Sequence, residues 1–153
     1  MYIRNHTSED GAVLLKLFHD TVRNINIRDY SQEQVEAWAP VNFDLARWEN
    51  RVKNYKIFVA EDSKGIAGFA ELDTSGHIDC FYVHHDRQGQ GVGRLLLESV
   101  EKEALSQDTL RIFAEVSITA KPFFEHSGFV TIVEQQVEFR GQNLINYRMQ
   151  KHL

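Results

Sequence analysis

The chain has 153 residues, with 42% apolar and 25% charged side chains, so its length and composition match one ordinary globular domain spanning residues 1–153. Its 22 acidic residues outnumber its 17 basic residues, and the net charge of −5 argues against a nucleic-acid partner, which would require clustered Lys and Arg. Neither a signal peptide nor an apolar stretch of membrane-spanning length is visible, so we expect a cytoplasmic protein without a membrane partner.

The first third of the chain predicts one short strand and three helices. Residues 2–4 favour a strand, and Ser8-Glu9-Asp10 gives a start signal for the first helix. The apolar face of that helix consists of Val13, Leu14, Leu17, Phe18 and Val22. Ser31 and Gln34 form a capping-box pattern for a second helix, which should end before Pro40 because proline removes a backbone donor. Asp44 caps a third helical stretch.

The period then changes from helical spacing to that of strands. Residues 56–60 and 66–72 predict two strands, and the turn at residues 62–65 between them is typical of a hairpin. A third strand at residues 77–83 runs straight into a Gly-rich loop. We therefore expect three consecutive strands on the N-terminal side of that loop.

The Gly-rich loop leads into a helix from about Val92 to Leu105. Its expected apolar positions are Leu95, Leu96, Val100 and Leu105. Residues 110–116 predict the next strand, which should lie parallel to the third strand because a helix separates the two. The remaining elements are a short helix at 122–126 and strands at 130–139 and 144–149, joined by a turn at 140–142. We expect an α/β (mixed α+β) fold without an internal repeat or a domain boundary.

Three glycines, Gly89, Gly91 and Gly93, lie where the third strand meets this helix. A helix start leaves backbone N–H groups unpaired and carries a partial positive charge, so glycines there let an anion such as phosphate approach the backbone. A dinucleotide fingerprint would need glycine at Arg94, and the G-K-[ST] of a P-loop is absent. We therefore expect a phosphate-binding turn that differs from both nucleotide motifs.

Residues 82–93, including Gln88, Gly91 and Gly93 at defining positions, resemble the Q-x-x-G-x-G segment of the GNAT superfamily of acyl-CoA-dependent N-acyltransferases. Residues 121–129 are similar to its second signature, an aromatic pair, Glu, two variable residues and Gly-Phe. Trp38-Ala39-Pro40 resembles a small bacterial branch of unassigned substrate. The resemblance implies a mostly antiparallel sheet flanked by helices, with a parallel strand pair that splays open at the CoA site.

The resemblance also implies where acetyl-CoA binds. Phe81, Tyr82 and Val83 are expected to offer backbone groups to the pantetheine arm. The pyrophosphate is expected to lie against Gln88, Gly89, Gln90, Gly91, Val92, Gly93 and Arg94. Further cofactor contacts are expected from Ser117, Ala120, Lys121 and Phe124. Many family members have asparagine where Ser117 stands, so a side-chain amide contact to the pantetheine is expected to be missing from this position.

Transfer to an amine needs a base, because an alkylammonium with a pKa of about 10.4 is almost fully protonated at neutral pH. The candidates are His77, Asp79 and Glu71, on strands that precede the loop. His77 and Asp79 share one strand face by the period of two, and the resemblance places His77 where some members carry a glutamate base. The choice among these three remains open.

Two other groups of reactive residue types have simpler interpretations. Cys80, the single cysteine, reads as a small buried residue in a strand. His84, His85 and Asp86 are metal-ligand types, but adjacent residues on an extended segment should point in opposite directions, so we expect no metal.

The implied activity is transfer of an acetyl group from acetyl-CoA, as co-substrate, to a primary amine of a small molecule or peptide. The alternative is a CoA-binding sensor or interaction module without efficient catalysis. Phe124 stands where many members carry a tyrosine that protonates the leaving thiolate, so we expect catalysis without a dedicated acid. The acceptor amine, and the choice between monomer and homodimer, are left open.

Overall fold

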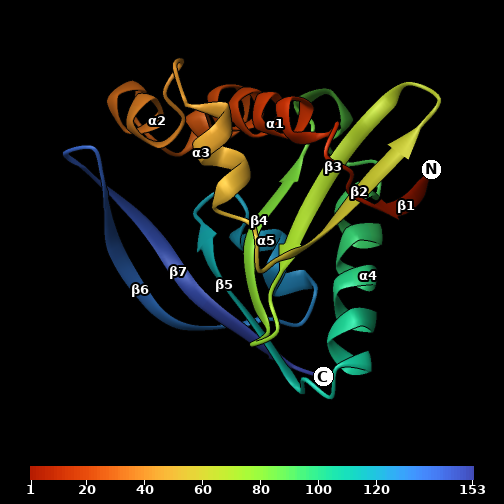
Figure 1. Cartoon of the computed structure of the whole chain (residues 1–153). Coiled ribbons are helices and arrows are strands. Elements are labelled where there is room, and N and C mark those ends of the chain that lie inside the picture. The colour runs from red at the N-terminus through yellow and green to blue at the C-terminus, as the bar shows by residue number, and fades with distance from the viewer.

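The computed structural model describes residues 1–153 and contains one seven-stranded sheet in the order β1-β2-β3-β4-β5-β7-β6 (Figure 1). The strands are β1 (Tyr2–Asn5), β2 (Lys56–Asp62), β3 (Gly65–Leu72), β4 (His77–Val83), β5 (Arg111–Ser117), β6 (Val130–Phe139) and β7 (Gln142–His152). The α-helices are α1 (Gly11–Asn24), α2 (Gln32–Trp38), α3 (Leu45–Asn50), α4 (Val92–Ser106) and α5 (Lys121–His126). Two 3₁₀ turns, η1 (Asn26–Arg28) and η2 (His85–Arg87), complete the described elements.

All neighbouring strands are antiparallel except β4 and β5, which are parallel, so the predicted mixed sheet is confirmed. The parallel pairing covers only His77 with Phe113 and Ile78 with Ala114, and beyond it the two strands diverge (Figure 1). A bulge in β4 increases its bend, because the step from Ile78 to Phe81 opposes only Leu72 to Ala70 of β3. The sheet is therefore split at its centre, between β4 and β5.

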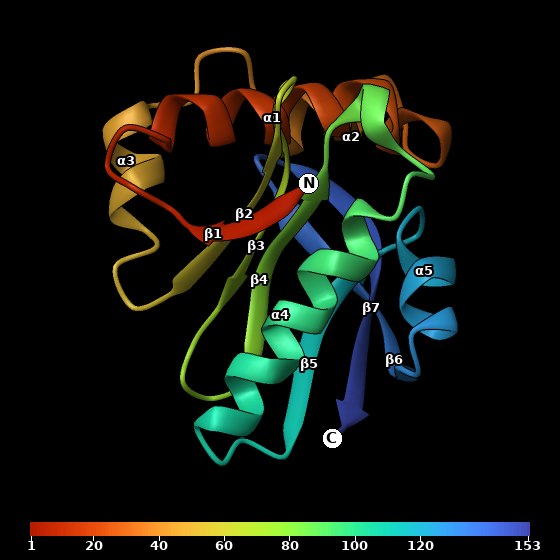
Figure 2. The same cartoon turned by 90° about the vertical axis from the view of Figure 1, so that its right-hand side faces the viewer.

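Helices cover both faces of the sheet. On β2, Ile57 and Val59 contribute to a core with α1, α2 and α3, whereas Phe58 and Ala60 contribute to a core with α4 and α5. This alternation follows from the strand period of two. Figure 2 shows α4 in front of the central strands, with α1 and α2 along the top. The longest helix, α4, has 15 residues, and no helix of the chain has the length and apolar character that crossing a membrane requires.

Local start signals are confirmed for α2 and α3. Ser31 and Gln34 exchange both hydrogen bonds of the capping box, and the Asp44 carboxylate accepts from the backbone N–H of Ala46. For α1 the start is predicted correctly, but Asp10 makes no capping hydrogen bond, because its carboxylate binds the Arg4 guanidinium instead.

Two residues predicted to lie on the buried faces of their helices are exposed. Val13 and Leu105 are about half exposed, at 48% and 50%, because each lies beside the buried stripe of its helix and not on it. The buried stripe of α4 consists of Val92, Leu96, Leu97, Val100 and Ala104. Strand β7 is longer than predicted, because it pairs with β5 from Arg111 to Ser117 and so extends to His152.

Candidate active site

The Gly-rich turn joins β4, through η2, to the start of α4. Gly89 and Gly91 have φ values of +71° and +83°, in the left-handed region, and a side chain at either would meet no atom within 4 Å. Gly93 has another role, since a Cβ there would lie 3.1 Å from the Phe123 ring, and glycine lets α5 approach α4. The first N–H groups of α4 have no intrahelical partner, and they follow directly after this turn in the chain. The turn can therefore bind an anion through its backbone.

A cavity of about 400 Å³, which we call the loop-side cavity, lies between this turn, the end of β4 and the start of α5. It collects every cofactor residue predicted from the sequence except Gln90 and Lys121. The predicted residues that line it are Phe81, Tyr82, Val83, Gln88, Gly89, Gly91, Val92, Gly93, Arg94, Ser117, Ala120 and Phe124. The Gln90 amide accepts from Arg87, and the Lys121 ammonium lies 4.8 Å from the Tyr147 ring centroid.

The backbone N–H and C=O groups of successive β4 residues point alternately toward β3 and toward the split. The His84 N–H donates to the Ala67 carbonyl, so strand alternation directs the backbone groups of Tyr82 toward β3 as well. The backbone groups of Phe81 and Val83 consequently face the split. The Val83 carbonyl already accepts from the Gln88 amide at 2.8 Å and from Thr21 at 3.0 Å, so the Gln88 side chain fastens the turn onto β4.

An amide stands beside Ser117, although not on β5. The Asn26 side-chain N–H₂ donates to the Ser117 hydroxyl at 3.3 Å, and that hydroxyl also accepts from the backbone N–H of Ala120 at 3.0 Å. Asn26 is buried and lines the loop-side cavity. The other lining residues that sequence reasoning missed are Thr21, Ile25, Arg87, Thr119 and Phe123. Of these, Arg87 and Phe123 adjoin the two motifs, whereas Asn26 comes from a distant helical segment and had no sequence signal.

A second cavity, of about 800 Å³, lies between α1–α3 and the β6–β7 hairpin, and we call it the hairpin-side cavity. A narrow space of about 50 Å³ lies in the split between β4 and β5. Asp79 and Glu115 line both this space and the hairpin-side cavity, whereas Phe81 and Phe124 line both it and the loop-side cavity. The split therefore connects a cavity with an anion-binding turn to a cavity with carboxylates.

Glu71 lines neither cavity. It is 1% exposed, and its two carboxylate oxygens each accept from the Arg51 guanidinium at 3.0 Å. Burial raises the pKa of Glu71, and the neighbouring Arg51 opposes that rise. Arg51 also donates to Asp79 at 2.6 Å and lies 3.8 Å from the Trp48 ring centroid. Arg51 thus bridges Glu71 and Asp79, and only Asp79 faces the hairpin-side cavity.

His77 is held by both ring nitrogens. Its Nε2 lies 2.6 Å from a Glu115 carboxylate oxygen, its Nδ1 lies 2.9 Å from the Tyr55 hydroxyl, and its ring stacks on Phe113. The hydrogen bond to Glu115 raises the pKa of His77, although burial opposes it, and the same bond lowers the pKa of Glu115. Burial raises the pKa of Tyr55 to about 12. The structure brings His77 and Asp79 to one cavity, as predicted from the strand period.

Cys80 is buried, as predicted, and burial raises its pKa, which makes it a poor nucleophile.

The expectation that His84, His85 and Asp86 point in opposite directions is wrong. The 3₁₀ turn η2 curls this segment, so the two imidazole rings stack with centroids 4.5 Å apart, and the three possible ligand atoms lie within 4.8 Å of one another. The prediction assumed that these three residues continue the extended strand, but β4 ends at Val83, one residue before His84.

Comparison with known proteins gives consistent matches. Residues 26–151 match the family model of the acetyltransferase (GNAT) domain. The uncharacterized N-acetyltransferase YafP of Escherichia coli (strain K12) is 33% identical over 147 residues, which cover 96% of this chain and 93% of that protein. A crystal structure of a GCN5-related N-acetyltransferase from Rhodopseudomonas palustris superposes with a TM-score of 0.95 at 34% identity, covering 99% of this chain and 95% of that one.

A more distant structure shares the fold. YncA, a putative acetyltransferase from Salmonella typhimurium solved with acetyl-CoA, superposes with a TM-score of 0.69 at 24% identity, covering 100% of this chain and 94% of that one.

Proposed function

The chain belongs to the GNAT family of acetyltransferases, and we propose that it transfers the acetyl group of acetyl-CoA to a primary amine bound in the hairpin-side cavity. The observation that carries this proposal is the split between β4 and β5. It connects an anion-binding turn on one side with the carboxylates Asp79 and Glu115 on the other. Acyl transfer from CoA to an amine needs a site for each reactant, and the two sites must meet at one reacting carbon.

We propose that the pyrophosphate of CoA binds the backbone of residues 88–94 at the start of α4. The pantetheine arm then runs along β4 toward the split, because the backbone N–H and C=O groups of Phe81 and Val83 point away from β3 and make no hydrogen bond to it. Asn26 and Ser117 supply polar groups on the opposite wall. The cofactor residues proposed from the sequence thus extend from the turn to the split, with Asn26 in addition.

In the proposed reaction, the amine nitrogen attacks the thioester carbonyl carbon, an N–C bond forms, and the C–S bond breaks to release CoA thiolate. The nitrogen then loses one further proton, which the thiolate or solvent takes up, to give the neutral amide. The incoming ammonium must lose a proton first. Among the three candidate groups we favour Asp79 and His77, because both line the cavity, whereas Glu71 is enclosed with Arg51. Asp79 is 38% exposed and suits the role of orienting the ammonium.

His77, whose pKa is raised by Glu115, is the better proton acceptor, because a base works best when its pKa lies near the working pH. Both of its nitrogens are already hydrogen-bonded, so proton uptake by His77 requires one of these bonds to be exchanged.

Phe124 cannot protonate the departing thiolate. Its ring is buried and contacts Phe81 and Phe129 at centroid distances of 5.4 Å and 4.9 Å, so its proposed role is to pack the wall of the split. A thiol has a pKa of about 8.5, so the thiolate is a tolerable leaving group near neutral pH. The proposed mechanism therefore needs no dedicated acid.

The test is release of free CoA thiol from acetyl-CoA in the presence of a panel of primary amines, with the acetylated product identified by mass. We expect amine-dependent release and a mass increase of one acetyl group. Tight CoA binding by calorimetry, with no release for any amine, would contradict the proposal and favour a CoA sensor.

A further inference from the structure

The inner end of the hairpin-side cavity, next to the split, is acidic. Asp79 and Glu115 line this end, and the charge of the Arg51 guanidinium is offset by Glu71, which is buried behind it and lines no cavity. The two lining carboxylates therefore leave a charge of −2 when His77 is neutral. With His77 protonated the charge is −1. An ammonium is therefore attracted to this end in either protonation state.

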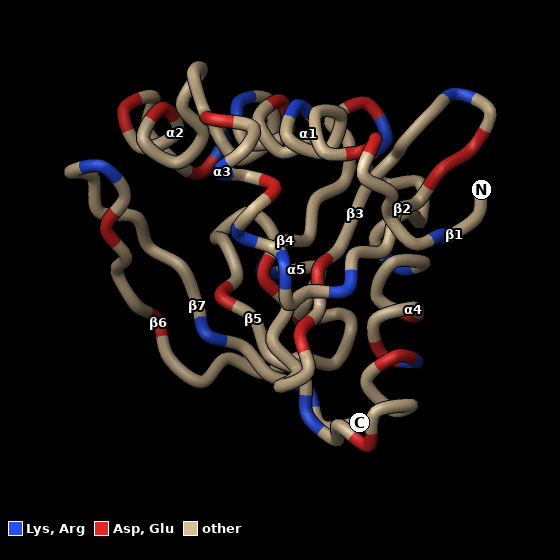
Figure 3. Tube along the Cα trace, viewed as in Figure 1, with Lys and Arg blue, Asp and Glu red and all other residues tan.

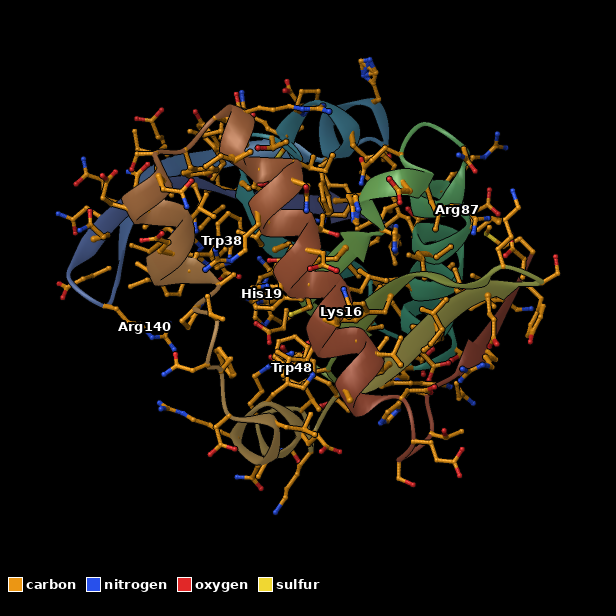
Figure 4. All side chains as sticks on the ribbon, turned by 90° about the horizontal axis from the view of Figure 1, so that it is seen from above. Lys16, His19, Trp38, Trp48, Arg87 and Arg140 are labelled. Carbon is orange, nitrogen blue, oxygen red and sulfur yellow. The ribbon has the colours of Figure 1, made fainter.

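The outer end is basic. Arg47, on α3, and Arg140, in the turn between β6 and β7, line the cavity, are exposed, and make no ion pair. The tip of the β6–β7 hairpin is blue in Figure 3, and Figure 4 shows Arg140 at the periphery, on the other side of α1 from Arg87. Glu138 is the one carboxylate among the lining residues here, so the two guanidiniums leave a charge of +1.

Arg140 is fixed in place. Its guanidinium donates to the Ala37 carbonyl at 2.7 Å and lies 5.5 Å from the Phe43 ring centroid. A guanidinium held in this way retains further N–H donors for a ligand, because it has five in total. Arg47 makes no side-chain hydrogen bond within the protein.

Aromatic side chains form the wall between the two ends. Seven of the lining residues are aromatic, and they are Phe18, Tyr30, Trp38, Phe43, Trp48, Tyr82 and Phe139. Trp48 already contacts the Arg51 guanidinium and stacks on Phe18, and Phe43 already contacts the Arg140 guanidinium. The middle of the cavity therefore suits an apolar body.

We propose that the acceptor is an amine that carries an anionic group, such as a carboxylate, at the far end of an apolar body. This inference rests on the proposed function, because it names the class of amine that the same cavity takes. The ammonium lies at Asp79 and Glu115, next to the split, and the anionic group lies at Arg47 and Arg140, where guanidiniums bind carboxylates through paired N–H groups. A diamine places its second cation against these arginines and is disfavoured.

Three amines with one shared body test this proposal: 4-(aminomethyl)benzoate, benzylamine and 1,4-bis(aminomethyl)benzene. We expect kcat/KM for CoA release to fall in that order, with about a fivefold difference between 4-(aminomethyl)benzoate and benzylamine, as for partly exposed ion pairs. Equal rates, or a preference for the diamine, would overturn the inference while leaving the proposed function intact.

A variant with the opposite charge at Arg47 provides a second test of the proposal. Arg47→Glu removes no side-chain hydrogen bond or ion pair, so it should fold, and we expect it to reduce the preference for the carboxylate by about fivefold and to favour the diamine. Arg28→Glu is the matched control, because Arg28 is exposed and lies outside the cavity. An Arg47→Glu ranking identical to that of Arg28→Glu would also overturn the inference. If no amine releases CoA, the proposed function fails, and calorimetry with the CoA-saturated protein still ranks the three amines by affinity.

Discussion

Replacing Arg51 with methionine should destabilise the protein strongly, because it leaves the Glu71 carboxylate buried without a partner. Glu71 is 1% exposed and takes both of its strong hydrogen bonds from Arg51. Breaking a buried ion pair by removing one partner costs about 3–5 kcal/mol. Since a domain has only about 5–15 kcal/mol of stability, we expect the melting temperature to fall by roughly 6–20 °C.

The loss should depend on pH, and its sign follows from Glu71. Burial already raises the pKa of this carboxyl, and removal of Arg51 removes the charge that opposes the rise. A carboxyl with a folded-state pKa above its unfolded value favours folding below the unfolded pKa and loses that contribution as the pH rises through the folded pKa. The deficit of Arg51→Met should therefore be small near the ordinary glutamate pKa of about 4.3 and full at about pH 8.

The assay is urea denaturation followed by circular dichroism at about pH 5 and about pH 8. Arg47→Met is the matched control, since Arg47 lies on the same helix and has no ion-pair partner, and we expect its effect to stay within about 0.5 kcal/mol. Adding Glu71→Gln to Arg51→Met should recover part of the loss, because the buried charge is gone. A deficit for Arg51→Met below about 1 kcal/mol, or one that does not change with pH, would refute this reasoning.

Four further predictions concern the turn, the split, the proton acceptor and the contribution of the His77–Glu115 pair to folding. Gly91→Glu should abolish CoA binding by calorimetry, because it places an anion where the pyrophosphate meets the backbone, whereas Gly141→Glu, with the same φ of +83° and equally open space, should not. Phe124→Tyr should change kcat by less than about tenfold, or about 1.4 kcal/mol, and a hundredfold gain would show that a missing proton donor limits the natural protein. Glu115→Gln should move the acidic limb of the kcat/KM pH profile to lower pH, because loss of the carboxylate lowers the pKa of His77. An unmoved limb would exclude His77 as its source. The stabilising effect of the His77–Glu115 pair on folding should be present below the unfolded pKa of histidine, about 6.5, and disappear as the pH rises through the raised folded value, which denaturation of His77→Gln at about pH 6 and pH 9 can measure.

Much of the fold is readable from the sequence because its signals are local. The capping box of Ser31 and Gln34 needs only four residues, and the turn at Gly89 and Gly91 needs positive φ values that glycine adopts at no steric cost. The crossover between strands at 77–83 and 110–116 follows from the helix between them. These features depend on neighbours in the chain, so the sequence alone was sufficient to predict the parallel pair and the glycine turn.

The residues that line the split, where we propose that the reaction takes place, depend instead on tertiary structure. The strand period placed His77 on one face with Asp79, but it carried no information that Glu115 and Tyr55 would occupy both ring nitrogens. Asn26 reaches Ser117 from a segment 91 positions away in the sequence, where no local pattern marks it.

The separation of Glu71 from Asp79 has the same origin. Both were reasonable bases by type, and the packing of α3 onto the sheet brings Arg51 to them and leaves only Asp79 open to the cavity. Contacts of this kind are set by strand register and by the angle at which helices pack, which local spacing does not encode. The sequence by itself therefore determined the family, the sheet and the position of the glycine turn that we propose as the phosphate site, whereas the tertiary structure alone decided which carboxylates face the split, because burial and ion pairing are properties of the assembled chain.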